Sequence, residues 1–174
     1  MQGHPEHMTD APFSAPQNTV ETEALREKLY NTRKVSKSGA NWYYWIAGLS
    51  LANGIMLATE TDWGFIFGLG TTQVMQVLLS ENATMGFLSI LPFAGIFIAI
   101  GYWAGRPSHV GYITGMILYA LDGLIYVIAE DWLNAGFHAF ALFLINVGRA
   151  AIAQTARLEA ELGQKNQTGI SGFE

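Results

Sequence analysis

Two titratable side chains stand within apolar stretches, and they are the groups of this sequence best placed to do chemistry. Asp122 lies eight or nine residues before a polar turn at Glu130–Asp131, and His138 lies seven or eight residues after it. At a helical rise of about 1.5 Å per residue, both side chains would lie about 12 Å from the turn, at equal depth. Asn53 lies five residues before the end of an earlier apolar stretch. We therefore predict one polar cluster of Asn53, Asp122 and His138.

A carboxyl group beside an imidazole can share a proton, which leaves three roles open for Asp122 and His138. The first is a hydrogen bond that locks two helices, since a charged carboxylate inside a membrane costs roughly 2.5–3.5 kcal/mol and needs a partner. The second is a proton or ion path. The third is ligation of a tetrapyrrole metal by His138, although the apolar stretches hold no second histidine for bis-histidine haem. We favour the structural hydrogen bond and expect no cofactor.

Sequence patterns typical of enzymes are missing. The chain has no HExxH, no GxSxG and no pair of aspartates within its apolar stretches. It has no cysteine, which excludes disulfides, thiol catalysis and cysteine-bound metals. Gly68 and Gly70 are not followed by the GK[ST] of a phosphate-binding loop. We therefore predict a protein that is not an enzyme and has no metal site.

The composition is that of a membrane protein. Of the 174 residues, 51% are hydrophobic and 13% are charged, whereas soluble proteins have about 25% charged residues. Four stretches match the roughly 20 helical residues that cross a bilayer core: residues 39–58, 85–104, 110–129 and 132–153. Aromatic residues near their ends are typical of the interfacial belt: Trp42, Tyr43, Tyr44, Trp45, Trp63, Tyr102, Trp103, Tyr112 and Trp132. We predict an all-α integral membrane protein with a bundle of four transmembrane helices.

The charges predict how this bundle is oriented. All nine Lys and Arg residues fall at one end of the four stretches, before residue 39, at residue 106 and from residue 149 onward. The connections at the other end carry five acids and no cation. Because cytoplasmic loops are enriched in Lys and Arg, we expect a multi-pass protein of a bacterial inner membrane with both termini in the cytoplasm. The net charge of −5 gives no indication of a nucleic-acid partner.

A fifth apolar stretch, residues 63–80, does not fit this count. If it crossed the membrane, Arg106 would lie outside and the acids at 130 and 131 inside. Gly68, Gly70 and Gln73 also interrupt it with groups that need partners or water. We expect a re-entrant or interfacial segment packed on the outer face of the bundle; the alternative is a weakly apolar fifth span.

The remaining predictions concern helix packing and the chain ends. Gly111 and Gly115 have the GxxxG spacing that lets helices approach closely, and we expect the same of Gly86, Gly95, Gly101 and Gly105. Residues 1–18 are predicted to be a disordered cytoplasmic tail. Residues 19–38 form an amphipathic cytoplasmic helix, either at the membrane surface or as a solvated linker. The membrane domain then covers residues 39–154, and 155–174 form a cytoplasmic C-terminal tail.

The chain resembles a group of small bacterial polytopic membrane proteins with no assigned function. The resemblance rests on WYYWIAGLSLANG (42–54), FIFGLGTTQ (65–73), GMILYALDGLIYVIAEDWLNAGFHAFAL (115–142) and the glycine at 148. It implies a shared four-helix body and makes Asn53, Gln73, Asp122, Asp131 and His138 recurring polar positions. The group usually has an aliphatic residue where Thr71 or Thr72 stands. It supplies no activity to carry over.

Two functions are compatible with these features. We expect a small non-enzymatic membrane protein, an accessory or scaffold subunit that associates with the lipid bilayer and with other membrane subunits or itself. The small size and the glycine-rich helices motivate this hypothesis. The alternative is a small transporter or an ion- or proton-conducting oligomer that uses Asn53, Asp122 and His138.

Overall fold

The described part of the protein consists of helices joined by short turns. The computed structural model describes residues 17–59, 68–79, 81–106 and 108–171, and it has no strand among them. The helices are α1 (Gln17–Ala58), α2 (Gly70–Leu78), α3 (Ala83–Leu88), α4 (Ile90–Ala104), α5 (His109–Ile128) and α6 (Trp132–Ser171). Three helical stretches are long and apolar enough to cross a membrane, namely Thr84–Ala104, His109–Ile128 and Trp132–Gln167. The apolar half of α1 falls outside this set because Asn41, Asn53 and a run of Trp and Tyr lower its mean hydropathy.

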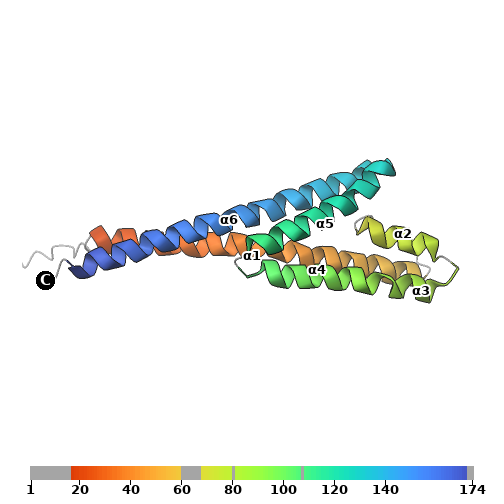
Figure 1. Cartoon of the computed structure of the whole chain (residues 1–174), viewed down its shortest axis with the longest axis horizontal. Helices are drawn as coiled ribbons and strands as arrows, with labels where there is room; N and C mark the ends of the chain where they lie inside the picture. Colours follow the sequence, from red (N-terminus) through yellow and green to blue (C-terminus); the bar gives the residue numbers. More distant parts are fainter. Residues whose placement is uncertain (1–16, 60–67, 80, 107, 172–174) are drawn as a thin grey trace, which may run out of the picture.

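The two long helices, α1 and α6, define the shape of the molecule. They lie side by side at one end and then separate, α1 toward α4 and α6 toward α5 (Figure 1). They meet closely at Gly39 and Gly148, where a Cβ on Gly39 would lie 2.6 Å from the Cα of Gly148. Only glycine at both positions permits this approach, so the crossing point is set by the sequence.

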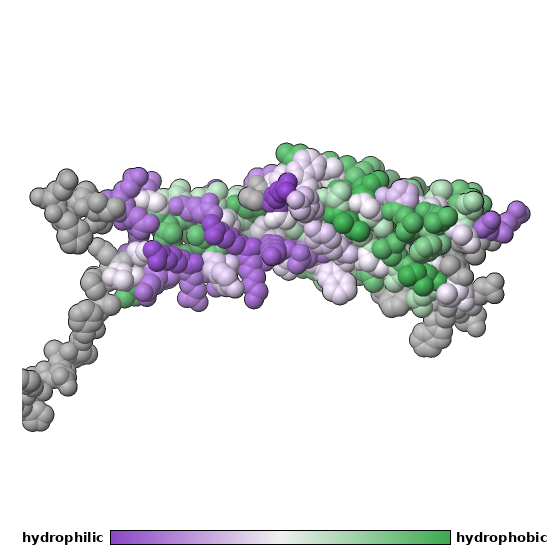
Figure 2. Space-filling model, turned by 90° about the horizontal axis from the view of Figure 1, so that it is seen from below, coloured by the Kyte–Doolittle hydropathy of each residue, from purple (hydrophilic) through white to green (hydrophobic). Residues whose placement is uncertain are grey.

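The paired ends of α1 and α6 form a helical stalk, defined here as residues 17–38 and 154–171. Its interior holds Leu29 and Leu158, and the ion pair Arg33–Glu159 (2.6 Å) joins the two helices at its surface. Figure 2 shows that this half of the molecule is mostly hydrophilic, whereas the other half is mostly hydrophobic.

The stalk differs from the predicted chain ends in two respects. The predicted amphipathic helix 19–38 is not separate, because α1 runs through residue 39 without interruption. The predicted tail 155–174 is helical as far as Ser171. Each stalk helix buries a leucine in their shared interior, and packing of this kind stabilises helices that would be marginal in isolation. The predicted tail 1–18 lies almost wholly outside the described residues, as does Trp63.

Apolar helices and a short inserted helix make up the rest of the fold. α2 lies in the opening between the α1–α4 pair and the α5–α6 pair (Figure 1). The predicted span 85–104 is divided into α3 and α4 at Ser89. Pro92 accounts for the division, because its ring clashes with the carbonyl of the residue four positions earlier and lacks an N–H group.

A column of aromatic rings fills the interface between these pairs. Tyr112, Tyr119 and Tyr126 follow one another at intervals of seven on α5, and all are buried. Tyr43 packs between Tyr112 and Phe97, and its hydroxyl donates to the Tyr112 carbonyl at 2.8 Å. The prediction that Tyr43 and Tyr112 belong to the interfacial belt is therefore wrong, since both are core residues. The belt prediction fits the exposed rings Tyr44, Trp45, Tyr102, Trp103 and Trp132.

Some of the helix glycines lie where another helix approaches closely, and others have no neighbour nearby. A Cβ on Gly115 would lie 2.5 Å from the Tyr43 ring, and one on Gly111 would lie 2.9 Å from the Ala104 nitrogen. Both predicted packing positions are confirmed. In the second span, Gly101 faces the Tyr44 ring at 3.0 Å, but Gly95 has nothing within 4 Å. Gly86 and Gly105 meet only backbone of nearby residues, so the prediction fails for these two and for Gly95.

Gly115→Ala tests the packing of the aromatic column. The new methyl group would collide with the buried Tyr43 ring and with Ile100 at 2.6 Å, and overpacking of this kind costs about 1–3 kcal/mol. We expect the variant to unfold at correspondingly lower denaturant concentration in detergent micelles. Gly136→Ala is the control, because nothing lies within 4 Å of that position and alanine favours a helix. Equal stability of the two variants would contradict this packing.

Candidate functional site

The candidate site is built where the chain enters α2. The carbonyl of Gly68 accepts a hydrogen bond from the Tyr126 hydroxyl at 3.1 Å. The Leu69 N–H donates to Ser50 Oγ at 3.1 Å, and the same hydroxyl donates to the Ile46 carbonyl at 2.9 Å. Leu69 is buried against α1 and α5. This backbone is therefore fixed by side chains from both neighbouring helices.

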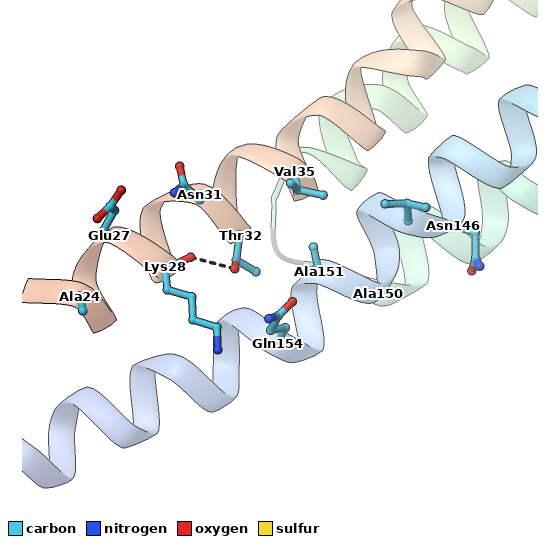
Figure 3. Close-up of a pocket in the computed structure, with 11 residues that line it drawn as sticks. Ala24, Glu27, Lys28, Asn31, Thr32, Val35, Asn146, Ala150, Ala151 and Gln154 are labelled. Carbon is cyan, nitrogen blue, oxygen red and sulfur yellow. Dashed lines mark hydrogen bonds between the residues drawn. The ribbon is translucent and has the colours of Figure 1, made fainter. Parts of the chain in front are cut away.

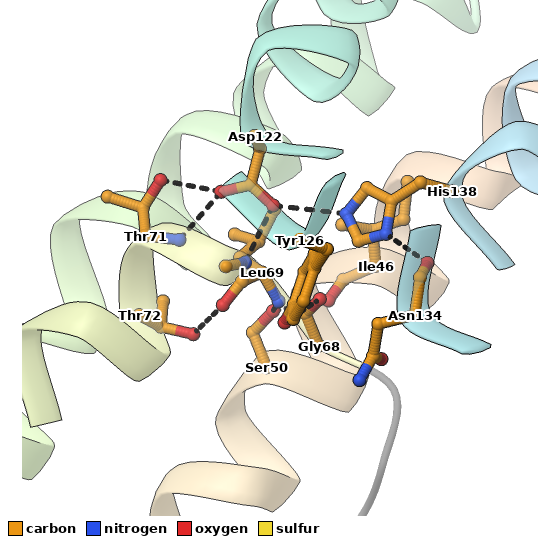
Figure 4. A network of polar contacts seen from close by, with 11 residues as sticks. Ile46, Ser50, Gly68, Leu69, Thr71, Thr72, Asp122, Tyr126, Asn134 and His138 are labelled. Atoms are coloured by element: carbon orange, nitrogen blue, oxygen red, sulfur yellow. Dashed lines mark hydrogen bonds and ion pairs between the residues drawn. The ribbon is translucent and has the colours of Figure 1, made fainter. Parts of the chain in front are cut away.

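Asp122 supplies the cap that the α2 sequence itself lacks. The N-cap residue is Leu69, whose side chain accepts no hydrogen bond. In its place Asp122 of α5 accepts the Gly70 N–H at Oδ2 (2.7 Å) and the Thr71 N–H at Oδ1 (2.8 Å). The Thr71 hydroxyl also donates to Oδ1 at 2.5 Å. A carboxylate at a helix N-terminus satisfies free N–H groups and is stabilised by the helix dipole, so Asp122 anchors α2 to α5 (Figure 4).

His138 of α6 completes the shell of donors around Asp122. Its Nε2 lies 3.1 Å from Asp122 Oδ2, and its Nδ1 lies 2.9 Å from the Asn134 carbonyl. A carbonyl can only accept, so Nδ1 carries a proton. One further proton lies between Nε2 and Oδ2. Together with the three donors of α2, this shared proton completes the hydrogen bonding of the Asp122 carboxyl group.

Aromatic rings enclose the imidazole. Tyr119 stacks on it with ring centroids 4.2 Å apart and planes inclined by 19°, and Tyr126 lies at 5.0 Å. Gly123 leaves room for the His138 side chain, since a Cβ at this glycine would lie 3.0 Å from the Cβ of His138.

The network continues to the turn between α5 and α6. Asp131 Oδ1 accepts the Asn134 N–H at 3.2 Å, and Oδ2 accepts its side-chain N–H at 2.7 Å. These hydrogen bonds, that from the Asn134 side chain foremost, lower the pKa of Asp131 below its usual value. Asp131 thereby caps α6. At this turn Glu130 has a φ of 57°, and the Asp131 N–H bonds the Tyr126 carbonyl at 2.9 Å, which ends α5 in a tight hairpin.

The structure brings together some of the predicted site residues and not others. Asp122 and His138 are in contact, as the hairpin geometry predicts. Asn53 packs instead against Gly68, where a Cβ would lie 2.6 Å from Asn53 Nδ2, and it has no hydrogen bond to Asp122 or His138. Gly68 and Gly70 belong to the site through their backbones. Gln73 lies one turn further along α2 and takes no part.

Sequence reasoning missed four members of the site. Ser50, Thr71, Tyr119 and Tyr126 all contact the Asp122–His138 pair or the turn that it holds. The seven-residue spacing of the tyrosines was the available signal for two of them.

The hydrogen bonds of His138 limit its availability as a metal ligand. Both ring nitrogens of His138 face hydrogen-bond partners, so a tetrapyrrole metal would have to displace one of them. Within the described residues no group of three or more His, Asp or Glu could hold a metal ion. A pocket of about 350 Å³ between α2, α4 and α5 reaches Asp122 and Thr71 and is otherwise lined by apolar side chains.

Comparisons with known proteins add nothing to this description, since no family model, no curated protein and no solved structure matches the chain.

Asp122→Ala tests whether the carboxylate anchors α2. The change leaves the N–H groups of Gly70 and Thr71 without acceptors, and each buried unsatisfied donor costs about 1–3 kcal/mol. We expect a loss of at least about 2 kcal/mol in unfolding free energy and faster hydrogen exchange throughout residues 70–78.

The matched control is Asp131→Ala, which removes an acid from the same hairpin but leaves α2 untouched. It should cost about 1 kcal/mol through the lost cap and keep the protection of residues 70–78. If both variants exchanged alike in α2, Asp122 would not be its anchor.

Proposed function

We propose that this protein is a small non-enzymatic subunit of the bacterial inner membrane that acts as an accessory or scaffold in a larger assembly. The observation that carries the proposal is the set of hydrogen bonds around its buried Asp122 carboxyl group. Four hydrogen-bonding groups, three from α2 and one from α6, occupy the carboxyl group of Asp122. A carboxylate so enclosed holds helices together, whereas a transport or catalytic group needs a position open to its substrate.

Helix lengths and charge support a four-span topology for this subunit. α1 and α6 have 42 and 40 residues, which corresponds to about 60 Å each, twice the thickness of a bilayer core. Half of each helix therefore crosses the membrane together with α3–α4 and α5, and the other half forms the stalk. The cations lie in the stalk and at its base, which favours a cytoplasmic stalk with both termini inside. In this arrangement α2 is a re-entrant helix that enters from the outer side.

The junction between the stalk and the adjoining part of α6 offers a surface for a helix of a partner subunit. A groove of about 660 Å³ runs between α1 and α6 (Figure 3). Small residues such as Ala24, Ala150 and Ala151 line it and permit close approach, and Asn31 and Gln154 offer hydrogen-bonding amides. A groove of this composition suits the mixed apolar and polar face of an amphipathic helix.

Purification in mild detergent tests the scaffold role. We expect the protein to co-purify with the same membrane partner at every concentration, and we expect Ala150→Glu to release that partner by placing a charge in the groove. Ala156→Glu makes the same change at an exposed position of α6 outside the groove, and it should retain the partner. A lone monomer from native membranes would contradict the proposal.

A transporter is the second candidate, favoured by the pocket that reaches Asp122 from the α4–α5 face. Reconstituted liposomes separate the two functions. The scaffold role predicts no flux of protons or common ions, whereas flux that Asp122→Asn abolishes would establish transport.

A further inference from the structure

A second pocket lies where the stalk meets the apolar body. Its volume is about 350 Å³, and three elements line it. Arg33, Ser36 and Lys37 come from α1, Thr155 and Glu159 from α6, and Gly105 from the turn after α4. Of the pockets described, this one has two cations among its lining residues.

The pocket coincides with the membrane boundary on every element that lines it. Ser36 and Lys37 directly precede the apolar half of α1, Gly105 follows the last residue of α4, and Thr155 follows the apolar half of α6. The neighbouring rings Tyr102 and Trp103 are 60% and 43% exposed, as expected of side chains at head-group depth. The pocket therefore opens at the level of lipid phosphates.

Its charges are arranged to receive an anion. The Arg33 guanidinium is 2.6 Å from Glu159, and both side chains are largely exposed, so four of its five N–H groups remain available. Lys37 forms no ion pair with any described residue. Two cations and one carboxylate leave a net charge of +1. The Ser36 hydroxyl lies in the same pocket and can also donate to a phosphate, whereas the Thr155 hydroxyl donates to the Ala151 carbonyl at 2.9 Å.

We propose that this pocket binds the phosphate of an anionic phospholipid from the cytoplasmic leaflet. Arg33 and Lys37 hold the phosphate, and the acyl chains lie along the exposed apolar side chains of α4, which include Ile98. Basic pockets at the cytoplasmic ends of membrane helices bind anionic head groups in this way. The proposal depends on the cytoplasmic position of the stalk but not on the scaffold role.

The test uses the full chain in neutral detergent, with unfolding temperature and native mass spectrometry as readouts. Phosphatidylglycerol should raise the unfolding temperature and remain bound, whereas phosphatidylcholine and inorganic phosphate should have little effect. Equal stabilisation by inorganic phosphate would overturn the assignment to a lipid, and equal stabilisation by phosphatidylcholine would overturn the role of charge.

Three charge variants locate the site. Lys37→Gln should weaken phosphatidylglycerol binding about fivefold, the effect of one cation near an anionic lipid. Lys34→Gln removes the same charge from α1 outside the pocket and should leave binding unchanged. Glu159→Gln removes the competing carboxylate and should strengthen binding to a similar extent. Equal weakening by Lys34→Gln and Lys37→Gln, or weaker binding by Glu159→Gln, would overturn the proposed pocket.

Discussion

The arrangement of this protein depends on one buried carboxylate that must be surrounded by donors. Asp122 lies on an apolar helix where a negative charge without partners would be unstable. It obtains two N–H groups from the start of α2, a hydroxyl from Thr71 and an imidazole from α6. These contacts satisfy polar groups of α2 and of α6 that would otherwise lack a partner. Burial of the carboxyl group and packing of α2 against α5 therefore stabilise each other.

The same constraint explains why small and aromatic residues gather on α5. Asp122 can contact both α2 and α6 only if α5 packs closely against its neighbouring helices. Gly115 and Gly123 permit this close packing, because the missing side chains leave room for Tyr43 of α1 and His138 of α6. The tyrosines at intervals of seven then fill the space beside the pair. Exposed Leu and Ile side chains cover the remaining face of α5. One helix thus has a face for the site and a face for lipid.

The sequence predicted the contact between Asp122 and His138, but it did not predict that Asp122 holds the start of α2. Depth counting from a turn locates Asp122 opposite His138, because helical rise is constant and the hairpin is short. It could not show that α2 begins at the carboxylate, since that depends on tertiary packing of a loop with no capping residue of its own. Position near the end of an apolar stretch likewise led to the wrong prediction that Tyr43 and Tyr112 belong to the interfacial belt. A tyrosine near a helix end can face either lipid or a neighbouring helix. The extent of helix at the chain ends was underestimated, because each stalk helix is stabilised by packing against the other.

The most direct test of this account is a distance measurement in wild-type protein in lipid bilayers. Solid-state NMR can measure dipolar coupling between the amide nitrogens of Gly70 and Thr71 and the carboxyl carbon of Asp122. The account predicts strong coupling for both, consistent with N···O separations of 2.7 and 2.8 Å. Absence of coupling at both positions would show that the carboxylate does not hold α2.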